Sequence, residues 1–559
     1  MRSIADLMQR ARHSRPTISA EALIVLVAAF LVCVDNVALW RSVLEGRSWV
    51  YASTWGYALA VFVLLVGTYY VLLSVFATRV TLKPILICAL SAGAAVAYFV
   101  FRYQIVFDAA MVRNVLHTDP QEAAELVDGG LLLTLLILGV VPSALVMRVH
   151  IRRRPWRRAV LVRTATWVMA LVVAVSSLLI VFQDIASLVR NRRDVRYLLT
   201  PLNLFASTAR SLRTEFAAAA ATPDPPVVVQ RDPAANTARP TLLVLVVGET
   251  ARAANFSLNG YPRETNPELA KLDIINFSQT RACGTSTEVS LPCMFSPFGR
   301  RSYDEARILR HESLVQQVAR AGIRVIWRDN QSGCKGVCSG VEVQRFDHQE
   351  LPGVCVSGRC FDEVLLQGMD TLARDNSGDL MLVLHQIGNH GPAYYRRYPP
   401  EFKRFEPACE TDALHKCTQQ EIVNAYDNAL RYTDHVLAQL IAFLQTQRGR
   451  YDVALMYVSD HGESLGEKGL YLHGMPYPIA PKEQLDVPMI WWLSPEFAHN
   501  RNIDVDCLRT RARSVASHDH LFHSITGVLN VTTPDREQAL DLFAQCRQDA
   551  TQRAIVVSR

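Results

Sequence analysis

Two carboxylates and an imidazole stand directly after short, apolar, β-rich segments in the second half of this sequence. Glu249 follows one such segment, and Asp460 with His461 follows another. Carboxylate oxygens and an imidazole nitrogen form a mixed set of ligands that suits Zn²⁺ with one coordination position left open. Because an open position is typical of catalytic zinc, these three residues predict a catalytic metal site.

A turn rich in hydroxyl groups supplies a residue for the open position. The turn reads Cys283-Gly-Thr-Ser-Thr287 and leads into an apolar run that resembles a helix start. Zinc would lower the pKa of the Thr287 hydroxyl by direct coordination, and a helix N-terminus would favour the alkoxide and any phosphate bonded to it. The alternative is that these hydroxyls only cap the helix, which Thr and Ser commonly do at this position.

These side chains need a scaffold in which several strands end at one edge. From Thr241 onward, continuous apolar runs alternate with helical periods, which indicates an α/β domain with a parallel sheet buried on both faces. The predicted strands are 241–247, 323–327, 380–384, 453–458 and 487–492, and the predicted helices are 309–320, 361–374, 419–445 and 519–529.

Further polar residues follow the second and third of these strands, namely Asp329, Asn330, His385 and His390. Ligands of open α/β sheets collect beyond the carboxyl ends of the strands, so these residues are expected near the metal site. Any one of them alone could instead be a helix cap or a satisfied core group.

Five runs in the first third of the chain approach the roughly 20 apolar residues that a helix needs to cross a bilayer. They cover residues 21–40, 51–77, 83–101, 129–147 and 164–182. Buried core helices are the alternative, but those carry polar faces and rarely exceed about 15 apolar residues. The first run is not a cleaved signal, because no small-residue cleavage site ends it and further spans follow.

Clusters of basic residues precede the first run and follow the second and fourth. They are Arg2, Arg10, Arg12, Arg15, Arg79, Lys83, Arg148, Arg152, Arg153, Arg154, Arg157 and Arg158. Basic loops stay on the cytoplasmic side, so about five spans place the chain after residue 182 on the far side, which in a bacterium is the periplasm. This topology accounts for much of the net charge of +6, and no nucleic-acid partner is needed to explain it.

Ten of the 12 cysteines lie in the C-terminal part, and only Cys33 and Cys88 lie in the apolar runs. We interpret the ten as disulfides, because an exported domain is in an oxidising compartment. Metal binding is the alternative, but a structural zinc site needs cysteine pairs brought together in fours. The close pairs are Cys283 and Cys293, Cys334 and Cys338, Cys355 and Cys360, and Cys409 and Cys417, while Cys507 and Cys546 are further apart.

The chain is therefore expected to have three parts. Residues 1–184 form a helical transmembrane domain, 185–240 a periplasmic bridging helix and linker, and 241–559 a periplasmic catalytic domain. Within the bridge, the polar-apolar pattern of 185–216 predicts one helix along the membrane surface. Residues 217–240, which are rich in Ala, Pro and Asp, predict a linker.

Several motifs together resemble the phosphoethanolamine transferases of Gram-negative bacteria, nearest to the branch that modifies lipid A and is associated with polymyxin resistance. The likeness runs over nearly the full length and includes the loop 108–122, with Asn114 and Thr118-Asp-Pro. The other motifs are Val246-Val-Gly-Glu-Thr-Ala-Arg, Asn255-Phe-Ser-Leu-Asn-Gly-Tyr-Pro-Arg-Glu-Thr, Cys283-Gly-Thr-Ser-Thr, His385-Gln-Ile-Gly-Asn-His-Gly-Pro, Val458-Ser-Asp-His-Gly-Glu-Ser-Leu-Gly-Glu and Tyr471-Leu-His-Gly-Met-Pro.

The resemblance implies an alkaline-phosphatase-like (sulfatase-like) fold for the catalytic domain. It also implies that Thr287, the nucleophile, helps to hold the zinc together with Glu249, Asp460 and His461. Three further positions match residues that relatives use around the substrate: His390 and His473, which in some members bind a second zinc, and Lys335, which lies near the phosphate. The asparagine usual just upstream of that lysine appears here as Asn330 followed by Gln331, which leaves the contacting side chain open.

The expected reaction transfers phosphoethanolamine from phosphatidylethanolamine to a lipid A phosphate through a phosphothreonine on Thr287, and a histidine, His390 or His473, protonates the leaving alkoxide. The resemblance places this enzyme in the bacterial inner membrane among membrane lipids, and we expect a monomer. Three alternatives stay open: transfer to core sugars of lipopolysaccharide, another phosphotransferase or hydrolase of the same fold, and a non-catalytic sensor. A sulfatase would need a modifiable Cys or Ser in Cys/Ser-x-Pro-x-Arg, and none stands near Thr287.

Overall fold

The computed structural model describes residues 16–192, 194–220, 222–232, 239–346, 351–356 and 359–547. The chain divides into two compact units, Met1–Val112 with Val127–Arg210, and Arg113–Leu126 with Ser211–Arg559. Arg113–Leu126 thus belongs with the second unit, although both of its flanks belong to the first. Four of the predicted basic residues, Arg2, Arg10, Arg12 and Arg15, lie outside the described residues.

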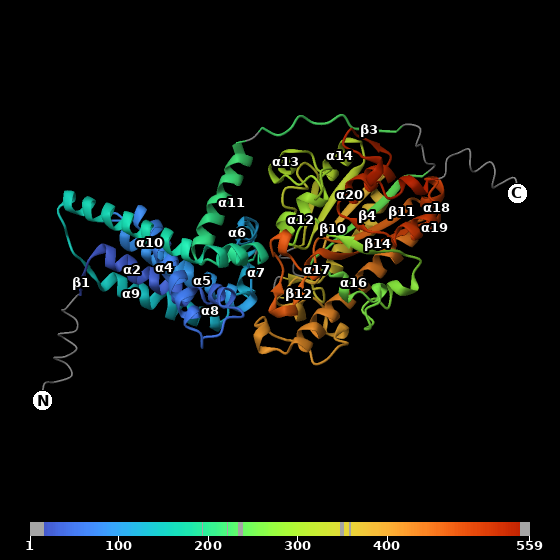
Figure 1. Cartoon of the computed structure of the whole chain (residues 1–559). Helices are drawn as coiled ribbons and strands as arrows, with labels where there is room; N and C mark the ends of the chain where they lie inside the picture. The colour runs from blue at the N-terminus through green and yellow to red at the C-terminus, as the bar shows by residue number, and fades with distance from the viewer. Residues whose placement is uncertain are drawn as a thin grey trace. The chain divides into compact units, whose positions relative to one another are not determined.

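The first unit is built from apolar helices (Figure 1). Within the described residues, four helices are long and apolar enough to cross a membrane, and a bent pair, Ala20–Asp35 with Val37–Val43, makes a fifth if it counts as one span. This confirms the helical N-terminal part with about five spans. The four are α4 (Ala52–Val75), α5 (Leu82–Tyr103), the continuous run Gly129–Arg148 that contains α8 (Gly129–Thr134) and α9 (Val141–Arg148), and α10 (Trp156–Asn191).

Large apolar side chains of these helices point outward. Leu59 of α4 and Leu179 and Ile180 of α10 are each more than half exposed. Such an outer surface suits lipid rather than water. The one helix expected over 185–216 is divided, because α10 ends at Asn191 and α11 (Leu202–Ala220) begins only after Pro201. A proline in a helix interior clashes with the preceding turn and lacks the amide hydrogen.

The second unit contains an eight-stranded sheet in the order β15-β5-β14-β11-β4-β10-β6-β7. The four consecutive strands β11, β4, β10 and β6 are parallel, as predicted. β14 is antiparallel to both of its neighbours, so the expectation of a purely parallel sheet was wrong. The strands are β4 (Thr241–Gly248), β5 (Ile275–Arg281), β6 (Arg324–Asp329), β7 (Glu342–Arg345), β10 (Leu380–His385), β11 (Asp452–Ser459), β14 (Asp486–Leu493) and β15 (Ala516–Ser517).

Helices cover both faces of this sheet, with α14 (Leu314–Arg320) and α20 (Asp519–Val528) on one side and α16 (Gln419–Gln447) on the other (Figure 1). Every residue of β4 is buried, and its alternate residues Leu243 and Leu245 pack into the core beneath α14 and α20. The sandwiched sheet therefore confirms the α/β, sulfatase-like fold class. Other helices of this unit are α7 (Pro120–Glu125), α12 (Thr287–Met294), α13 (Glu305–Arg310), α15 (Met369–Asp375), α17 (Lys482–Leu485), α18 (Pro495–Asn500) and α19 (Val505–Arg511).

Local signals explain where the predicted helices begin and end. Thr418 and Glu421 form a capping box at the start of α16, and Ser313 forms one at the start of α14. That second cap divides the helix expected over 309–320 into α13 and α14. Gly368, whose φ is +70°, precedes α15 and breaks the helix expected over 361–374.

Five disulfides link the ten cysteines of the second unit. The four close pairs form as predicted, and Cys507 bonds to Cys546. Cys33 and Cys88 are free thiols. Four of the bridges close loops of ten residues or fewer, so they pin local turns rather than distant parts of the chain.

Candidate active site

The ends of β4 and β11 bring the two predicted carboxylates together. These strands are parallel neighbours in which Ser459 pairs with Gly248, so the residues that follow them, Asp460 and Glu249, emerge side by side. One ligand atom from each of Glu249, Asp460 and His461 lies within 4.8 Å of the others, and all three residues are buried. The structure thus assembles the predicted cluster at the carboxyl edge of the sheet.

Thr287 is the first residue of α12, and its hydroxyl points into this cluster. Its Oγ1 donates a 2.9 Å hydrogen bond to Glu249 Oε2 and lies 3.4 Å from His461 Nε2. Ser286 occupies the N-cap position and makes no capping bond through its side chain. The capping alternative therefore does not describe Thr287, whose hydroxyl contacts the acidic cluster instead of the backbone of its own helix.

The three residues fit a divalent metal. His461 Nδ1 lies 2.9 Å from the carbonyl of Gly462, and this arrangement leaves Nε2 facing the carboxylates, 3.3 Å from Glu249 Oε1. In the described part of the chain, Glu249 Oε1 and Asp460 Oδ2 are buried and have no hydrogen bond. Buried carboxylate oxygens without donors are costly, and a cation bound between them and the imidazole would satisfy them.

Electrostatics lead to the same conclusion. Burial, reinforced by the nearby Glu249 charge, raises the pKa of Asp460 to about 6. Burial alone would lower the pKa of His461, but Asp460 and Glu249 raise it to about 10. A proton held this firmly on His461 marks a place where positive charge is strongly favoured, and metal binding would displace that proton.

His390 and His473 lie beside the cluster. The ring of His473 is 4.4 Å from that of His461 and 5.4 Å from that of His390, measured between centroids. Glu463 Oε2 lies 2.9 Å from His473 Nδ1, and Glu122 Oε1 lies 3.4 Å from His390 Nε2. Burial lowers the pKa of His390 to about 3, so this imidazole is neutral at ordinary pH.

Asn330 and Gln331 point in different directions. Asn330 Nδ2 donates to the Cys360 carbonyl and to Asp362, away from the cluster. Gln331 Nε2 donates a 2.8 Å hydrogen bond to Glu249 Oε2. Gln331, rather than Asn330, therefore reaches the site.

Lys335 lies near the cluster but contacts other groups. Its ammonium is 3.1 Å from Ser332 Oγ and 3.9 Å from Glu288 Oε2, and Glu288 directly follows Thr287. His117 Nδ1 lies 2.9 Å from the other oxygen of that carboxylate. The Lys335 ammonium therefore lies beside Glu288, the residue that follows the candidate nucleophile in the sequence.

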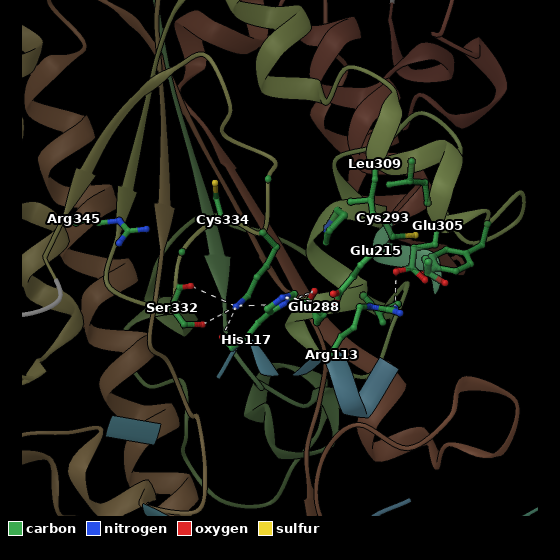
Figure 2. A pocket seen from close by; sticks show the side chains of 18 residues that line it. Arg113, His117, Glu215, Glu288, Cys293, Glu305, Leu309, Ser332, Cys334 and Arg345 are labelled. Atoms are coloured by element: carbon green, nitrogen blue, oxygen red, sulfur yellow. Dashed lines mark hydrogen bonds and ion pairs between the residues drawn. The ribbon is translucent and has the colours of Figure 1, made fainter. Parts of the chain in front are cut away.

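A cavity of about 590 Å³ opens beside Lys335, and Figure 2 shows His117 and Glu288 meeting within it. Cations and carboxylates line it together, including the ion pair between Arg113 and Glu305 at 2.6 Å. A lining of mixed charge next to Thr287 suits a ligand that carries both charges.

Two residues of the site were missed by sequence reasoning: Glu122 and Glu463. Glu122 and Glu463 stand inside motifs that were noted for other residues, but only the fold shows that they contact His390 and His473. His385 was expected near the metal. Its Nδ1 lies 3.1 Å from Asp329 Oδ2 on the neighbouring strand, and against the effect of burial the charges of Asp329, Glu249 and Asp460 raise its pKa, so the ring lies near the cluster.

Comparison with known proteins identifies the family. A family model described as "Sulfatase" matches residues 241–531, and one described as "Phosphoethanolamine transferase EptA/EptB" matches residues 65–216. The phosphoethanolamine transferase EptA of Escherichia coli K12 is 37% identical over 543 residues, which cover 96% of this chain and 98% of that protein. The chain belongs to the phosphoethanolamine transferase family.

Two further members of the family are similar to this chain over most of its length. Phosphatidylethanolamine transferase Mcr-1 of Escherichia coli is 38% identical over 491 residues, covering 86% of this chain and 90% of that one. The solved integral membrane protein lipooligosaccharide phosphoethanolamine transferase A from Neisseria meningitidis superposes with a TM-score of 0.91 at 36% identity, covering 96% of this chain and all of that one. The expected family and fold are therefore confirmed.

Proposed function

We propose that this transferase moves phosphoethanolamine from phosphatidylethanolamine to a phosphate of lipid A through a phosphothreonine on Thr287. The observation that carries the proposal is the hydrogen bond from the Thr287 hydroxyl to Glu249 inside a metal-type cluster. The setting is the bacterial inner membrane, with residues 1–184 in the bilayer, 185–240 as the bridge and 241–559 in the periplasm.

The residues around Thr287 prepare its oxygen for attack on phosphorus. Glu249 Oε2 accepts the hydroxyl proton in a hydrogen bond, which orients the oxygen lone pairs away from the carboxylate. The start of α12 directs backbone amides at the same place, where they stabilise the charge of a bound phosphoryl group. Zinc held by Glu249, Asp460, His461 and Thr287 would supply Lewis acidity and lower the pKa of the hydroxyl.

The histidines serve the leaving group. Loss of diacylglycerol from the donor needs a proton at the departing oxygen, and an imidazole beside the cluster can relay one. Glu463 engages His473 Nδ1 and thereby directs Nε2 toward the site, while His390 is the second candidate. Lys335, with the charge of its ammonium, would stabilise the transferring phosphate. The same proposal includes His390 and His473 as the ligands of a second zinc.

The acceptor distinguishes this proposal from its alternative, transfer to core sugars of lipopolysaccharide. Lipid A should be purified from cells that express the chain, from cells that express Thr287→Ala, and from cells with an empty vector. Mass spectrometry of the three samples should show phosphoethanolamine on lipid A only with the unaltered chain. Unmodified lipid A together with modified core oligosaccharide would favour the alternative acceptor and refute lipid A as the substrate.

A further inference from the structure

A second cavity, of about 780 Å³, lies on another side of the candidate site. It reaches the site through two of its lining residues. Gln331 donates to Glu249, and Glu122 contacts His390. A group bound in this cavity would therefore lie close to the residues that surround Thr287.

Three arginines line this cavity and converge on one buried carboxylate. Arg397 Nη2 lies 2.9 Å from Glu125 Oε2, and Arg359 and Arg396 pair with the other oxygen of Glu125. The Arg397 side chain is 4% exposed, and its Nε donates a 2.7 Å hydrogen bond to the carbonyl of His390. The arginine cluster is thus anchored both to Arg113–Leu126 and to the loop that carries His390.

Carboxylates offset part of the positive charge of this cluster. Arg359 and Arg397 share Glu125, whose side chain is 1% exposed, and the charge of Glu122, which also lines the cavity, acts on both guanidinium groups. Arg396 adds a third and also pairs with Asp412 at 3.3 Å. Burial, followed by the charges of Arg397 and Arg396, lowers the pKa of Arg359, as expected where cations crowd together. A further anion would relieve this repulsion.

The rest of the lining is largely apolar and aromatic. It includes Val356, Phe361, Ile387, Tyr395, Tyr398 and Pro400. A planar guanidinium binds two oxygens of a phosphate at once. Aromatic side chains pack against the sugar rings of a glycolipid and against the first carbons of its acyl chains. The cavity therefore has the chemistry for a phosphate carried on an amphiphile.

The charge of the two cavities separates donor from acceptor. A phosphoethanolamine headgroup carries an ammonium as well as a phosphodiester, which suits the mixed lining in Figure 2 that includes Glu215, Glu288 and Glu305. Three glutamates balance Arg113, Lys335 and Arg345 in that lining, whereas the three arginines of the second cavity outnumber its lining carboxylates, Asp119 and Glu122. A phosphomonoester carries up to two negative charges and no cation, so it fits the arginine-lined cavity better.

We propose that the cavity lined by Arg359, Arg396 and Arg397 holds the phosphomonoester of the glycolipid acceptor during the second half of the reaction, an inference that rests on the proposed function. One oxygen of the bound phosphomonoester dianion attacks the phosphorus on Thr287 and forms a new P–O bond. The bond from that phosphorus to Thr287 Oγ1 breaks, and the threonine oxygen keeps the electron pair and takes up a proton from solvent. The acceptor leaves with a diphosphoethanolamine group.

The test measures the two half-reactions separately on the full-length chain in detergent. Loading of Thr287 from phosphatidylethanolamine is followed by intact-protein mass spectrometry, and discharge is followed as purified lipid A is added. In the double variant Arg359→Gln/Arg396→Gln, the lipid A concentration for half-maximal discharge should rise about 10-fold or more, because each lost charged hydrogen bond weakens binding by about 1.5–3 kcal/mol. Loading should proceed at the parental rate.

Two controls sharpen the result. Arg374→Gln removes an exposed arginine of α15 that pairs with Asp370 outside both cavities, and it should change neither half-reaction. Arg396→Lys keeps the charge without the planar fork, so its discharge should fall between parent and double variant. Lipid A stripped of its phosphates should discharge none of these proteins.

Each contrary outcome has a separate meaning. A double variant that loads and discharges like the parent would overturn the arginine site. A double variant that loads slowly but discharges normally would assign the cavity to the donor headgroup and also overturn it. A parent that cleaves phosphatidylethanolamine without ever loading Thr287 would overturn the proposed function itself, and this inference with it.

Discussion

Gln331 and Thr287 donate hydrogen bonds to the same oxygen, Glu249 Oε2, over 2.8 and 2.9 Å. The amide of Gln331 therefore fixes the carboxylate that orients the candidate nucleophile. Because Glu249 is fully buried, water does not replace a lost donor, and the carboxylate is then held less firmly within the cluster.

Replacing Gln331 with methionine, which is similar in size but donates no hydrogen bond, should slow phosphoethanolamine transfer about 10-fold or more while bound zinc stays at the parental level. The expected loss corresponds to about 1.5–3 kcal/mol for a hydrogen bond to a charged group. Transfer is measured with fluorescent phosphatidylethanolamine, and zinc by elemental analysis. Gln420→Met, at the exposed start of α16, is the matched control and should change neither value. Parental rates in Gln331→Met would remove this residue from the mechanism.

Removal of zinc with a chelator should abolish transfer, and added zinc should restore it. The reason is that Glu249, Asp460 and His461 bring their ligand atoms together, and within the described residues two of the carboxylate oxygens have no hydrogen bond. Elemental analysis provides a readout that does not depend on activity. Glu249→Gln should lose the metal, whereas Glu264→Gln, an exposed glutamate, should keep it. Full activity in a preparation shown to contain no metal would contradict the metal assignment.

The covalent intermediate should accumulate when acceptor is scarce. Enzyme purified from membranes rich in phosphatidylethanolamine but starved of lipid A should carry one phosphoethanolamine, which peptide fragmentation should place within residues 282–294. The start of α12 stabilises the phosphothreonine, and water attacks it slowly without a general base aimed at the phosphorus. Thr287→Ala should show no adduct and no transfer. Continued donor cleavage without any adduct would point to a phosphodiesterase that uses water as the nucleophile.

Stability of the second unit should depend on pH through His311. Its Nε2 lies 2.8 Å from Asp535, and this hydrogen bond, against a smaller effect of burial, raises the pKa of His311. The resulting stabilisation is fully present below the ordinary histidine pKa of about 6.5 and is lost as pH rises through the raised value. Burial would raise the pKa of Asp535, but His311 lowers it. The stabilisation that comes from the Asp535 carboxylate is therefore lost only in acid.

His311→Gln should therefore lower thermal stability by the equivalent of about 1 kcal/mol near pH 6 and by much less near pH 9. Thermal unfolding of the full chain followed by intrinsic fluorescence at both pH values measures the difference. An equal loss at both pH values would mean that His311 contributes packing rather than charge.

The amino-acid pattern alone predicted the elements that carry the chemistry. β4, β10 and β11 are continuous apolar runs, and a strand buried on both faces admits little else. The polar residues that follow two of them, Glu249 and Asp460, had to meet because parallel neighbours end at the same edge. The close cysteine pairs were readable for a similar reason, since short loops bring their ends together at little entropic cost.

Tertiary structure alone decided the contacts between segments that are distant in the sequence. The direction of β14 depends on its pairing with β5 and β11, which its own apolar run does not encode. The choice of Gln331 over Asn330 depends on the side of β6 from which each side chain leaves the strand end. Glu122 and Glu125 lie in a segment flanked by membrane helices, yet they contact His390 and Arg397 of the second unit. The local sequence pattern indicates which residues are buried and which secondary structure they form. Contacts between charged residues that are distant in the sequence are decided only when the folded chain buries them together, away from water.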